Sequence, residues 1–375
     1  MSFPKKRSLR YPQRPPLMTL LALLAILGAP GSAWAEALVK SDVFVGGESD
    51  YHTFRIPALV ISNAGTTLAF CEGRKDSTSD QGNIDLLLKR SHDGGETWGD
   101  IQLVHEEGGD APITIGNPAP VVVHDDDTIH LLFTRNNRRL FYTQSTDEGL
   151  TWRAPRELTD ILSDLSFPWL RIGTGPVHGI QLRNGKLVVP IWYCDEEPHA
   201  KEKHYRAGVL LGSPDGATWQ AGGMVSGLIP KLNECTVLER KDASLLLNMR
   251  GYKNGFRAVA HSQDGGKTWS EPALEPALPD TTCQGSLFRL HDGRVLFSNV
   301  PGEQRESLSL TLSSDDGKTW EASQVLEAGP SAYADLAQRV DGTVLCLYER
   351  GEQRYNERIS VARIPLSWFQ PVAEP

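Results

Sequence analysis

The chain has 375 residues, of which 39% are hydrophobic and 23% are charged, and its formal net charge is −9 at neutral pH. This length could hold two ordinary domains, but no linker rich in proline, serine and glycine interrupts it, so we expect one domain. The acidic balance argues against nucleic acid and anionic membranes as partners, while still allowing a local basic pocket.

Residues 1–35 read as a secretory signal peptide. Five basic residues precede an apolar run from Leu17 to Leu27, and Ala33-Trp34-Ala35 places small residues at both positions that a signal peptidase recognises. We expect cleavage after Ala35 and export to the periplasm or the medium, which removes five positive and no negative charges and changes the formal charge from −9 to −14. The apolar run is too short to span a bilayer comfortably, so we expect no stable membrane insertion. The mature domain is then residues 36–375.

The rest of the chain repeats one short phrase five times. The pattern Ser-x-Asp-x-Gly-x-Thr-Trp, one residue shorter in its third copy, follows an apolar run each time and spans Ser91–Trp98, Ser145–Trp152, Ser213–Trp219, Ser262–Trp269 and Ser313–Trp320. Ser and Asp side chains can bond turn amides, Gly tolerates positive φ, and Trp can bury its ring between strands. We therefore interpret the phrase as a folding device with no part in catalysis.

The apolar runs indicate how many structural units the chain contains. Alternation between Asp-Gly or Asn-Gly turns gives six strand clusters, which begin near Arg55, Ala119, Gly179, Thr236, Gly285 and Leu336. With repeats at propeller-blade spacing, we predict an all-β fold, a six-bladed β-propeller of four-stranded antiparallel blades, with helix only in short connections. The last cluster lacks the phrase, and Ala37–Val45 is expected to supply its outer strand. Loops on one face of a propeller converge, so distant residues can share a pocket.

The cysteines and histidines show no pattern of a metal site. The five cysteines lie mostly in or beside apolar runs, at Cys71, Cys194, Cys235, Cys283 and Cys346. We expect buried free thiols, with a Cys235–Cys283 disulfide as the alternative. We expect no metal and no cofactor.

The segment Phe54-Arg55-Ile56-Pro57, ahead of the first repeated phrase, resembles the sialidase (neuraminidase) family of bacterial type, in which an Arg-Ile-Pro segment precedes a series of such Asp boxes. The resemblance covers nearly the whole mature chain. Other Asp-box propellers are not sialidases, so the function depends on the site residues. The resemblance implies an exo-α-sialidase that removes terminal sialic acids from glycoproteins, glycolipids or oligosaccharides with retention, through a tyrosine-linked covalent intermediate.

The same resemblance implies which residues bind the sugar. Three arginines, Arg55, Arg250 and Arg305, match those that clamp the sugar carboxylate. Guanidinium suits this task because its planar donors match a carboxylate bidentately and stay charged at any working pH. Arg74 matches the residue that contacts the sugar near its C4 group, and Glu349 matches the carboxylate that orients the first arginine.

The catalytic residues that the resemblance implies are Tyr333 as nucleophile, Glu234 as its base and Asp80 as acid/base. An unperturbed phenol titrates near pH 10, so it needs a base to act at neutral pH. A carboxylate nucleophile would approach a carbon that already bears a carboxylate, whereas a neutral phenol avoids that repulsion. Sialidases with a tyrosine nucleophile are accordingly exceptions to the scheme of most glycosidases, which use two carboxylates. Asp76 is the alternative acid/base.

The sequence leaves some choices open. Val177 stands where the family pattern has Gly, which leaves the leaving-group side undefined, and Phe167-Pro168-Trp169 and Trp192-Tyr193 could form an aromatic wall there or pack in the core. The alternative functions are a hydrolase of a related nonulosonic acid, an intramolecular trans-sialidase, and a non-catalytic sugar-binding propeller. The last would be expected to lack a catalytic residue. Oligomeric state and linkage preference are not indicated by the sequence.

Overall fold

Strands dominate the computed structural model of the chain, as predicted. The described residues, 1–2, 37–197, 201 and 204–369, contain 24 strands, and their helices are two short 3-10 turns, Thr159–Leu162 and Leu366–Phe369. None of these helices is long and apolar enough to cross a membrane. The expected signal peptide and its cleavage site lie outside the described residues.

Three sheets have four antiparallel strands each, paired in chain order. Sheet I contains β2 (Thr53–Ile61), β3 (Thr67–Arg74), β4 (Ile84–Ser91) and β5 (Gln102–His105). Sheet II contains β6 (Ile115–Val122), β7 (Ile129–Arg135), β8 (Arg139–Ser145) and β9 (Arg156–Glu157). Sheet IV contains β15 (Leu232–Glu239), β16 (Leu245–Gly251), β17 (Phe256–Ser262) and β18 (Ala273–Pro279).

Sheet III has a first strand that is interrupted. Its strands are β10 (Arg171–Thr174), β11 (Ile180–Gln181), β12 (Leu187–Cys194), β13 (Tyr205–Gly212) and β14 (Trp219–Met224). Both β10 and β11 pair antiparallel with β12, so together they act as one strand broken by the loop 175–179. The predicted start near Gly179 is therefore corrected to Arg171, because a four-residue strand carries too little alternation to be recognised.

Sheet V has seven strands and joins the two ends of the described domain. Its strands are β19 (Ser286–Arg289), β20 (Val295–Asn299), β21 (Glu306–Ser313), β22 (Gln324–Gln338), β23 (Val344–Arg350), β24 (Arg358–Ile364) and β1 (Val39–Val45). The first half of β22 pairs with β21 and its second half with β23. At the far edge β1 pairs antiparallel with β24, as predicted for the N-terminal strand.

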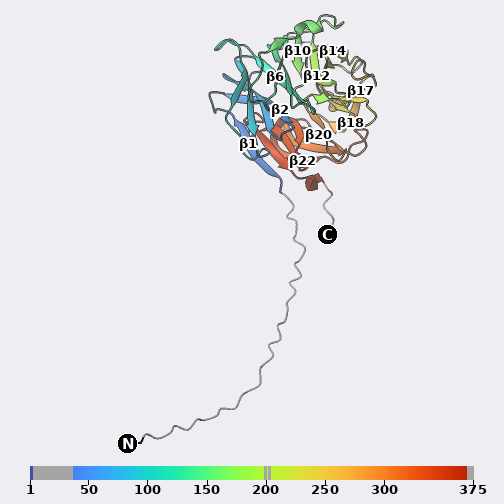
Figure 1. Cartoon of the computed structure of the whole chain (residues 1–375). Coiled ribbons are helices and arrows are strands. Elements are labelled where there is room, and N and C mark those ends of the chain that lie inside the picture. The colour runs from blue at the N-terminus through green and yellow to red at the C-terminus, as the bar shows by residue number, and fades with distance from the viewer. Residues whose placement is uncertain (3–36, 198–200, 202–203, 370–375) are drawn as a thin grey trace. The chain divides into compact units, whose positions relative to one another are not determined.

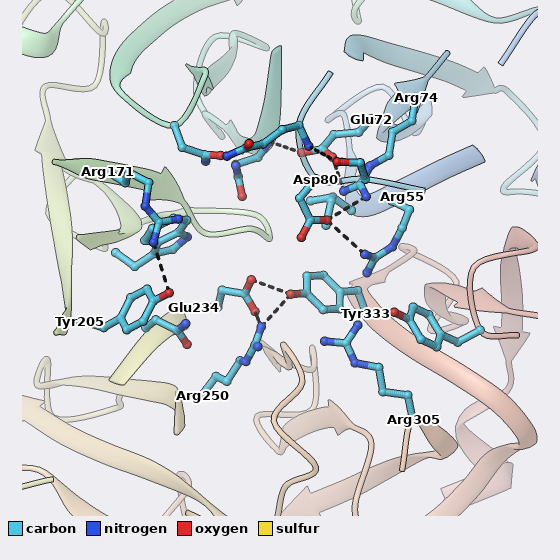
Figure 2. Close-up of a pocket in the computed structure, with 18 residues that line it drawn as sticks. Arg55, Glu72, Arg74, Asp80, Arg171, Tyr205, Glu234, Arg250, Arg305 and Tyr333 are labelled. Atoms are coloured by element: carbon cyan, nitrogen blue, oxygen red, sulfur yellow. Dashed lines mark hydrogen bonds and ion pairs between the residues drawn. The ribbon is translucent and has the colours of Figure 1, made fainter. Parts of the chain in front are cut away.

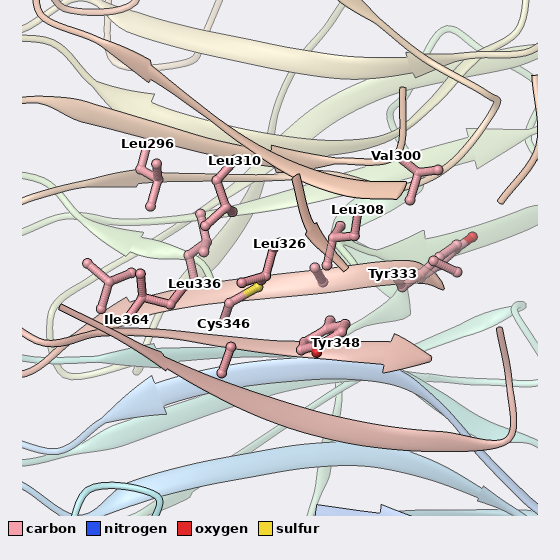
Figure 3. Packing of buried hydrophobic residues seen from close by; sticks show 14 of the residues in the cluster. Leu296, Val300, Leu308, Leu310, Leu326, Tyr333, Leu336, Cys346, Tyr348 and Ile364 are labelled. Atoms are coloured by element: carbon pink, nitrogen blue, oxygen red, sulfur yellow. The ribbon is translucent and has the colours of Figure 1, made fainter. Parts of the chain in front are cut away.

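Strands of neighbouring sheets pack side by side. β2 contacts β6, β6 contacts β10 and β11, β12 contacts β15, β15 contacts β19, and β19 contacts β22, which contacts β2 again. In Figure 1 the blue strands β1 and β2 accordingly lie beside the red strand β22. Buried apolar side chains fill the spaces between neighbouring sheets. Figure 3 shows a further cluster, formed mainly by residues of sheet V, to which Leu308, Leu336 and Tyr348 belong; the Tyr333 hydroxyl points away from these side chains.

The repeated phrases form the turns between the third and fourth strands. In the first copy the Ser91 hydroxyl donates to Asp93 (2.7 Å) and accepts the Gly95 amide (2.8 Å), and the full copies repeat these bonds. Trp152, at the end of the second copy, packs against Phe70 of the preceding sheet, with ring centroids 5.8 Å apart. None of the five phrases lines the cavity described below, in agreement with a purely structural role.

A buried carboxylate holds strands of different sheets together. Asp335, on β22, accepts the backbone amides of Leu59 on β2 (2.8 Å) and His178 in the loop 175–179 (3.0 Å). It also accepts the hydroxyl of Ser286 on β19 (2.7 Å). This fully buried group therefore fixes the strand that carries Tyr333 to three other parts of the chain.

Candidate active site

Four strands, β2, β6, β15 and β22, carry a β-bulge where they reach one cavity. The register shifts between Arg55 and Ala58, Gly116 and Ala119, Leu232 and Cys235, and Ser331 and Ala334. Such bulges re-aim side chains and are common next to active sites. Within them Arg55, Asn117, Glu234 and Tyr333 all line the cavity. In β2 the bulge places Ile56 at φ +61°, a conformation that β-branched residues rarely adopt.

The cavity, of about 490 Å³, brings together residues that the sequence analysis assigned to one site. Its lining includes Arg55, Arg74, Asp80, Glu234, Arg250, Arg305 and Tyr333, and Glu349 lies fully buried behind Arg55. In Figure 2, Tyr333, Glu234 and Arg250 point toward one another at the centre, with Asp80 and Arg55 on one side and Arg171 and Tyr205 across from them. The alternative Asp76 is exposed and does not line the cavity.

Tyr333, Glu234 and Arg250 form one hydrogen-bonded unit. The Tyr333 hydroxyl donates to Glu234 Oε1 (2.6 Å), and Arg250 Nη1 donates to Tyr333 Oη (2.8 Å) and to Glu234 Oε2. Burial and the Glu234 charge raise the pKa of Tyr333 well above its usual value, and Arg250 opposes this only in part. The phenol is thus neutral in the free site, with a carboxylate placed to receive its proton.

Arg55 is held by a bidentate pair with Glu349. Glu349 Oε1 accepts Arg55 Nε (3.0 Å) and the Ile56 amide (2.9 Å), and Oε2 accepts Arg55 Nη2 (3.0 Å). Burial lowers the pKa of Arg55, but the Glu349 charge outweighs it and holds that pKa well above its usual value. One carboxylate therefore fixes both the guanidinium and the bulge that presents it.

Asp80 lies between two guanidinium groups. Its Oδ1 is 2.8 Å from Arg74 Nη1 and 3.6 Å from Arg55 Nη1, and 80% of its side chain is exposed. Desolvation in the site raises the pKa of Asp80, but Arg74 and Arg55 outweigh it, so the pKa lies below its usual value. In the free site Asp80 is therefore ionised at neutral pH.

Arg305 completes a group of three arginines around Tyr333. Its guanidinium lies 5.3 Å from the centroid of the Tyr333 ring, and that of Arg55 lies 5.1 Å from it. Arg305 Nη2 donates to the Thr282 carbonyl (3.4 Å), and no Asp or Glu within the described part of the chain forms an ion pair with it. An uncompensated cation of this kind favours an anionic ligand.

Comparison with known proteins identifies the family. The profile of the BNR repeat-like domain matches residues 65–346. The chain is 30% identical to a sialidase of Micromonospora viridifaciens, over 94% of this chain and 57% of that protein. The chain belongs to the sialidase family. It is also 31% identical to an exo-alpha-sialidase of Aspergillus fumigatus, over 85% of each chain.

The fold of solved sialidases is also similar. The Hadza microbial sialidase Hz136 has a TM-score of 0.77 and 26% identity, over 88% of this chain and 69% of that one. The chain spans 57% of the length of the Micromonospora sialidase and 66% of that of a Bacteroides fragilis sialidase, which is 30% identical over 88% of this chain.

Several residues of this sialidase cavity were missed in the sequence. Glu72 accepts Arg74 Nη2 (2.7 Å) through Oε2 and the Asn117 amide (3.0 Å) through Oε1. This repeats the way Glu349 holds an arginine and the bulge amide of the next sheet. Glu72 on β3 and Glu349 on β23 each lie on the strand that pairs with a bulged strand, β2 or β22, so this shared position could have revealed Glu72.

The other missed residues come from places with no recognisable pattern. Asn137, Arg171, Tyr205 and Tyr355 line the cavity. Arg171 donates to the Glu196 carbonyl through Nε (2.7 Å) and to the Tyr205 hydroxyl through Nη2 (3.5 Å). These contacts give the sialidase cavity a polar wall on the side away from the three arginines.

Of the two possible aromatic walls, one residue reaches the cavity. Trp192 lines it, whereas Tyr193 is fully buried, and Phe167 and Trp169 pack against a hydrophobic core. Val177 is likewise fully buried and does not line the cavity. For Phe167 and Trp169 the structure therefore favours the alternative of packing against the core.

The cysteines form no disulfide. All five cysteines are free and buried, so the alternative Cys235–Cys283 disulfide is not formed. Within residues 37–197, 201 and 204–369, no cluster of three or more His, Cys, Asp or Glu side chains could hold a metal ion.

Proposed function

We propose that the chain is an exo-α-sialidase that hydrolyses terminal sialic acids with retention, through a covalent intermediate on Tyr333. The observation that carries this proposal is the unit of Tyr333, Glu234 and Arg250 beside two further arginines. Its substrates would be sialylated glycoproteins, glycolipids or oligosaccharides, and the reaction as written uses only protein side chains and water.

Substrate binding follows from the charges of the cavity. Arg55, Arg250 and Arg305 bind the sugar carboxylate, which places the anomeric carbon next to Tyr333 Oη. Arg250 already donates to this oxygen (2.8 Å), so it can stabilise negative charge there during attack. Because Arg305 has no carboxylate partner among the described residues, the substrate carboxylate supplies the missing counter-charge.

Two proton transfers accompany the first chemical step. Tyr333 Oη attacks the anomeric carbon while its proton passes to Glu234 Oε1, 2.6 Å away. Asp80 gives a proton to the departing glycosidic oxygen. In the second step Asp80 takes a proton from water, the water oxygen displaces Tyr333, and Glu234 returns the proton to the phenol. Two displacements restore the original anomeric configuration.

The acid step requires a protonated Asp80, although Arg74 and Arg55 keep its pKa low in the free site. The bound substrate resolves this conflict because its carboxylate lies at Arg55, one of these two arginines, and opposes the field of that guanidinium at Asp80. The pKa of Asp80 then rises when the substrate binds, which favours the protonated acid in the complex.

We also propose that the sheets form a six-bladed propeller. Sheets I to IV supply four blades, and sheet V supplies two that share the long strand β22. The packing of β2 against both β6 and β22 supports a closed ring of sheets. Export after cleavage behind Ala35 belongs to the same proposal, and N-terminal sequencing of the mature protein tests it.

Hydrolysis is preferred to intramolecular transfer because the relatives at 30–31% identity are named sialidases. The intramolecular trans-sialidase from Ruminococcus gnavus matches at 16% identity, which supports the fold alone. Release of free sugar from a fluorogenic sialoside distinguishes a hydrolase from a non-catalytic binding protein.

A 3-fluorosialyl fluoride tests the nucleophile directly. Fluorine beside the reaction centre destabilises the oxocarbenium-like transition states, so the glycosyl-enzyme should form and decay slowly. The intact mass should rise by one fluorosugar, and digestion should place it on the peptide with Tyr333. Tyr333→Phe should abolish labelling, while Tyr252→Phe, outside the cavity lining, should label normally. Labelling of Tyr333→Phe, or an adduct on Glu234 or Asp80, would contradict the proposal.

A further inference from the structure

Tyr355 contributes an aromatic face that the chemistry above does not use. It lies in the loop between β23 and β24 and lines the cavity. The centroid of its ring is 4.9 Å from the Arg305 guanidinium and 5.3 Å from that of Arg55. Both guanidinium groups are also within cation–π distance of Tyr333, so each has two rings nearby.

The two arginines depend on these rings to different degrees. Arg55 is already neutralised by two hydrogen bonds to Glu349, each 3.0 Å long. Arg305 has one long bond to a carbonyl (3.4 Å) and no ion pair among the residues described. Because Arg55 is fixed by Glu349, its positive charge repels the Arg305 guanidinium beside the same rings. The attraction to Tyr355 therefore matters mainly for the position of Arg305.

The loop that carries Tyr355 is itself held in shape. The carboxylate of Glu357 accepts the backbone amides of Glu352, Gln353 and Arg354, at 2.9–3.0 Å. The ring also packs against the cluster of buried residues that contains Tyr333. Tyr355 is thus a fixed surface against which a flexible arginine side chain can rest.

We infer that Tyr355 is a positioning residue, which holds Arg305 ready for the substrate carboxylate before the substrate arrives. This inference rests on the proposed function, because it takes the three arginines as the carboxylate site. A side chain that is ordered in advance loses less entropy on binding, so Tyr355 acts on affinity more than on the chemical step. Its effect on substrate binding is indirect, through the position of Arg305.

The test is a comparison of Tyr355→Leu and Tyr355→Phe in two backgrounds, the wild type and Arg305→Ala. The readouts are KM and kcat for an aryl α-sialoside and the Kd of 2,3-unsaturated sialic acid, which needs no turnover. In the wild-type background Tyr355→Leu should weaken kcat/KM and Kd roughly 10- to 30-fold, mostly through KM. Tyr355→Phe keeps the ring and should restore most of this loss. In the Arg305→Ala background Tyr355→Leu should cost at most about twofold.

The alternatives give different patterns. Equal losses in both backgrounds would overturn the inference, because Tyr355 would then act independently of Arg305. A Tyr355→Phe variant as poor as Tyr355→Leu would overturn it as well, and so would a loss confined to kcat. Thermal unfolding of each variant shows whether the fold is intact. If the wild type binds the unsaturated acid without hydrolysing sialosides, the proposed hydrolase fails while the Kd comparison still decides the role of Tyr355. A chain that neither binds the unsaturated acid nor hydrolyses sialosides contradicts both the proposed function and the role of Tyr355.

Discussion

Replacement of Glu349 by Gln should separate the roles of the buried ion pair in stability and in activity. The carboxylate accepts three hydrogen bonds, two from Arg55 and one from the Ile56 amide. In Glu349→Gln the remaining amide oxygen can still accept from Arg55 Nε and Ile56. The amide NH₂ group, however, faces the donor Arg55 Nη2, and the guanidinium loses its buried counter-charge.

The size of the effect follows from these contacts. Removal of one partner of a buried ion pair typically costs about 3–5 kcal/mol. Arg55 retains Asp80 at 3.6 Å, but that side chain is largely exposed, so it compensates little. We therefore expect Glu349→Gln to lower the free energy of unfolding by about 3 kcal/mol. Misplacement of Arg55 should lower kcat/KM roughly 30- to 1000-fold, since about 2–4 kcal/mol of transition-state binding is lost.

Urea unfolding and initial rates on a fluorogenic sialoside measure the two effects. Arg55→Met alone leaves Glu349 as an unpaired buried carboxylate and should be at least as unstable as Glu349→Gln. The double variant Arg55→Met/Glu349→Gln buries no charge and keeps an acceptor for Ile56, so it should be more stable than Arg55→Met while staying inactive. Glu303→Gln, at an exposed loop carboxylate, is the matched control. This reasoning would be refuted if the loss of unfolding free energy in the double variant equalled the sum of the losses in the two single variants.

Three further predictions concern other parts of the chain. Asp80→Ala should lower hydrolysis of a natural sialyl-oligosaccharide at least roughly 100-fold more than that of an activated aryl sialoside, which needs little protonation; comparable losses would reassign the acid. Gly116→Ala places a methyl group on the Glu72 carboxylate, so KM should rise and the free energy of unfolding should fall by about 1–3 kcal/mol, whereas Gly329→Ala, where a methyl group meets its neighbours at ordinary van der Waals distance, should change neither. Hydrogen bonds from Thr268 lower the pKa of Asp264 to about 2, so its stabilising contribution is present above pH 4 and is lost as pH falls from about 4 to 2. The melting temperature of Asp264→Asn should fall less steeply over that range than that of the wild type, and parallel curves would contradict the assignment.

The parts of the site that could be predicted from the sequence lie in short contiguous segments. Arg55-Ile56-Pro57, Asn233-Glu234 and Ser331-Ala332-Tyr333 each coincide with a β-bulge, so the local sequence both forms the bulge and supplies the functional side chain. The repeated phrases were predictable for a similar reason, because their hydrogen bonds close within eight residues.

The residues that escaped prediction depend on contacts between distant segments. Tyr355 is recognised as part of the site only once its loop lies against Arg305, fifty positions earlier in the chain. Arg171 lies on a four-residue strand whose register is set by β12. Asp335 looks like any polar residue in a strand until three separate segments are seen to bond to it. No local pattern encodes such partners, since they are defined by the packing of the sheets.

The pairing of β1 with β24 has a consequence for the order in which the chain can fold. Val39 pairs with Arg363 and Val45 with Arg358, so the first strand waits for a partner that is synthesised more than 300 residues later. Until then β1 is an unpaired edge, and contacts this distant in sequence form slowly. A nascent or truncated chain without β24 would lack the seam between its ends. The sheet can therefore be completed only after β24 has been synthesised, and chains that end before β24 are expected to be degraded by proteases or to aggregate.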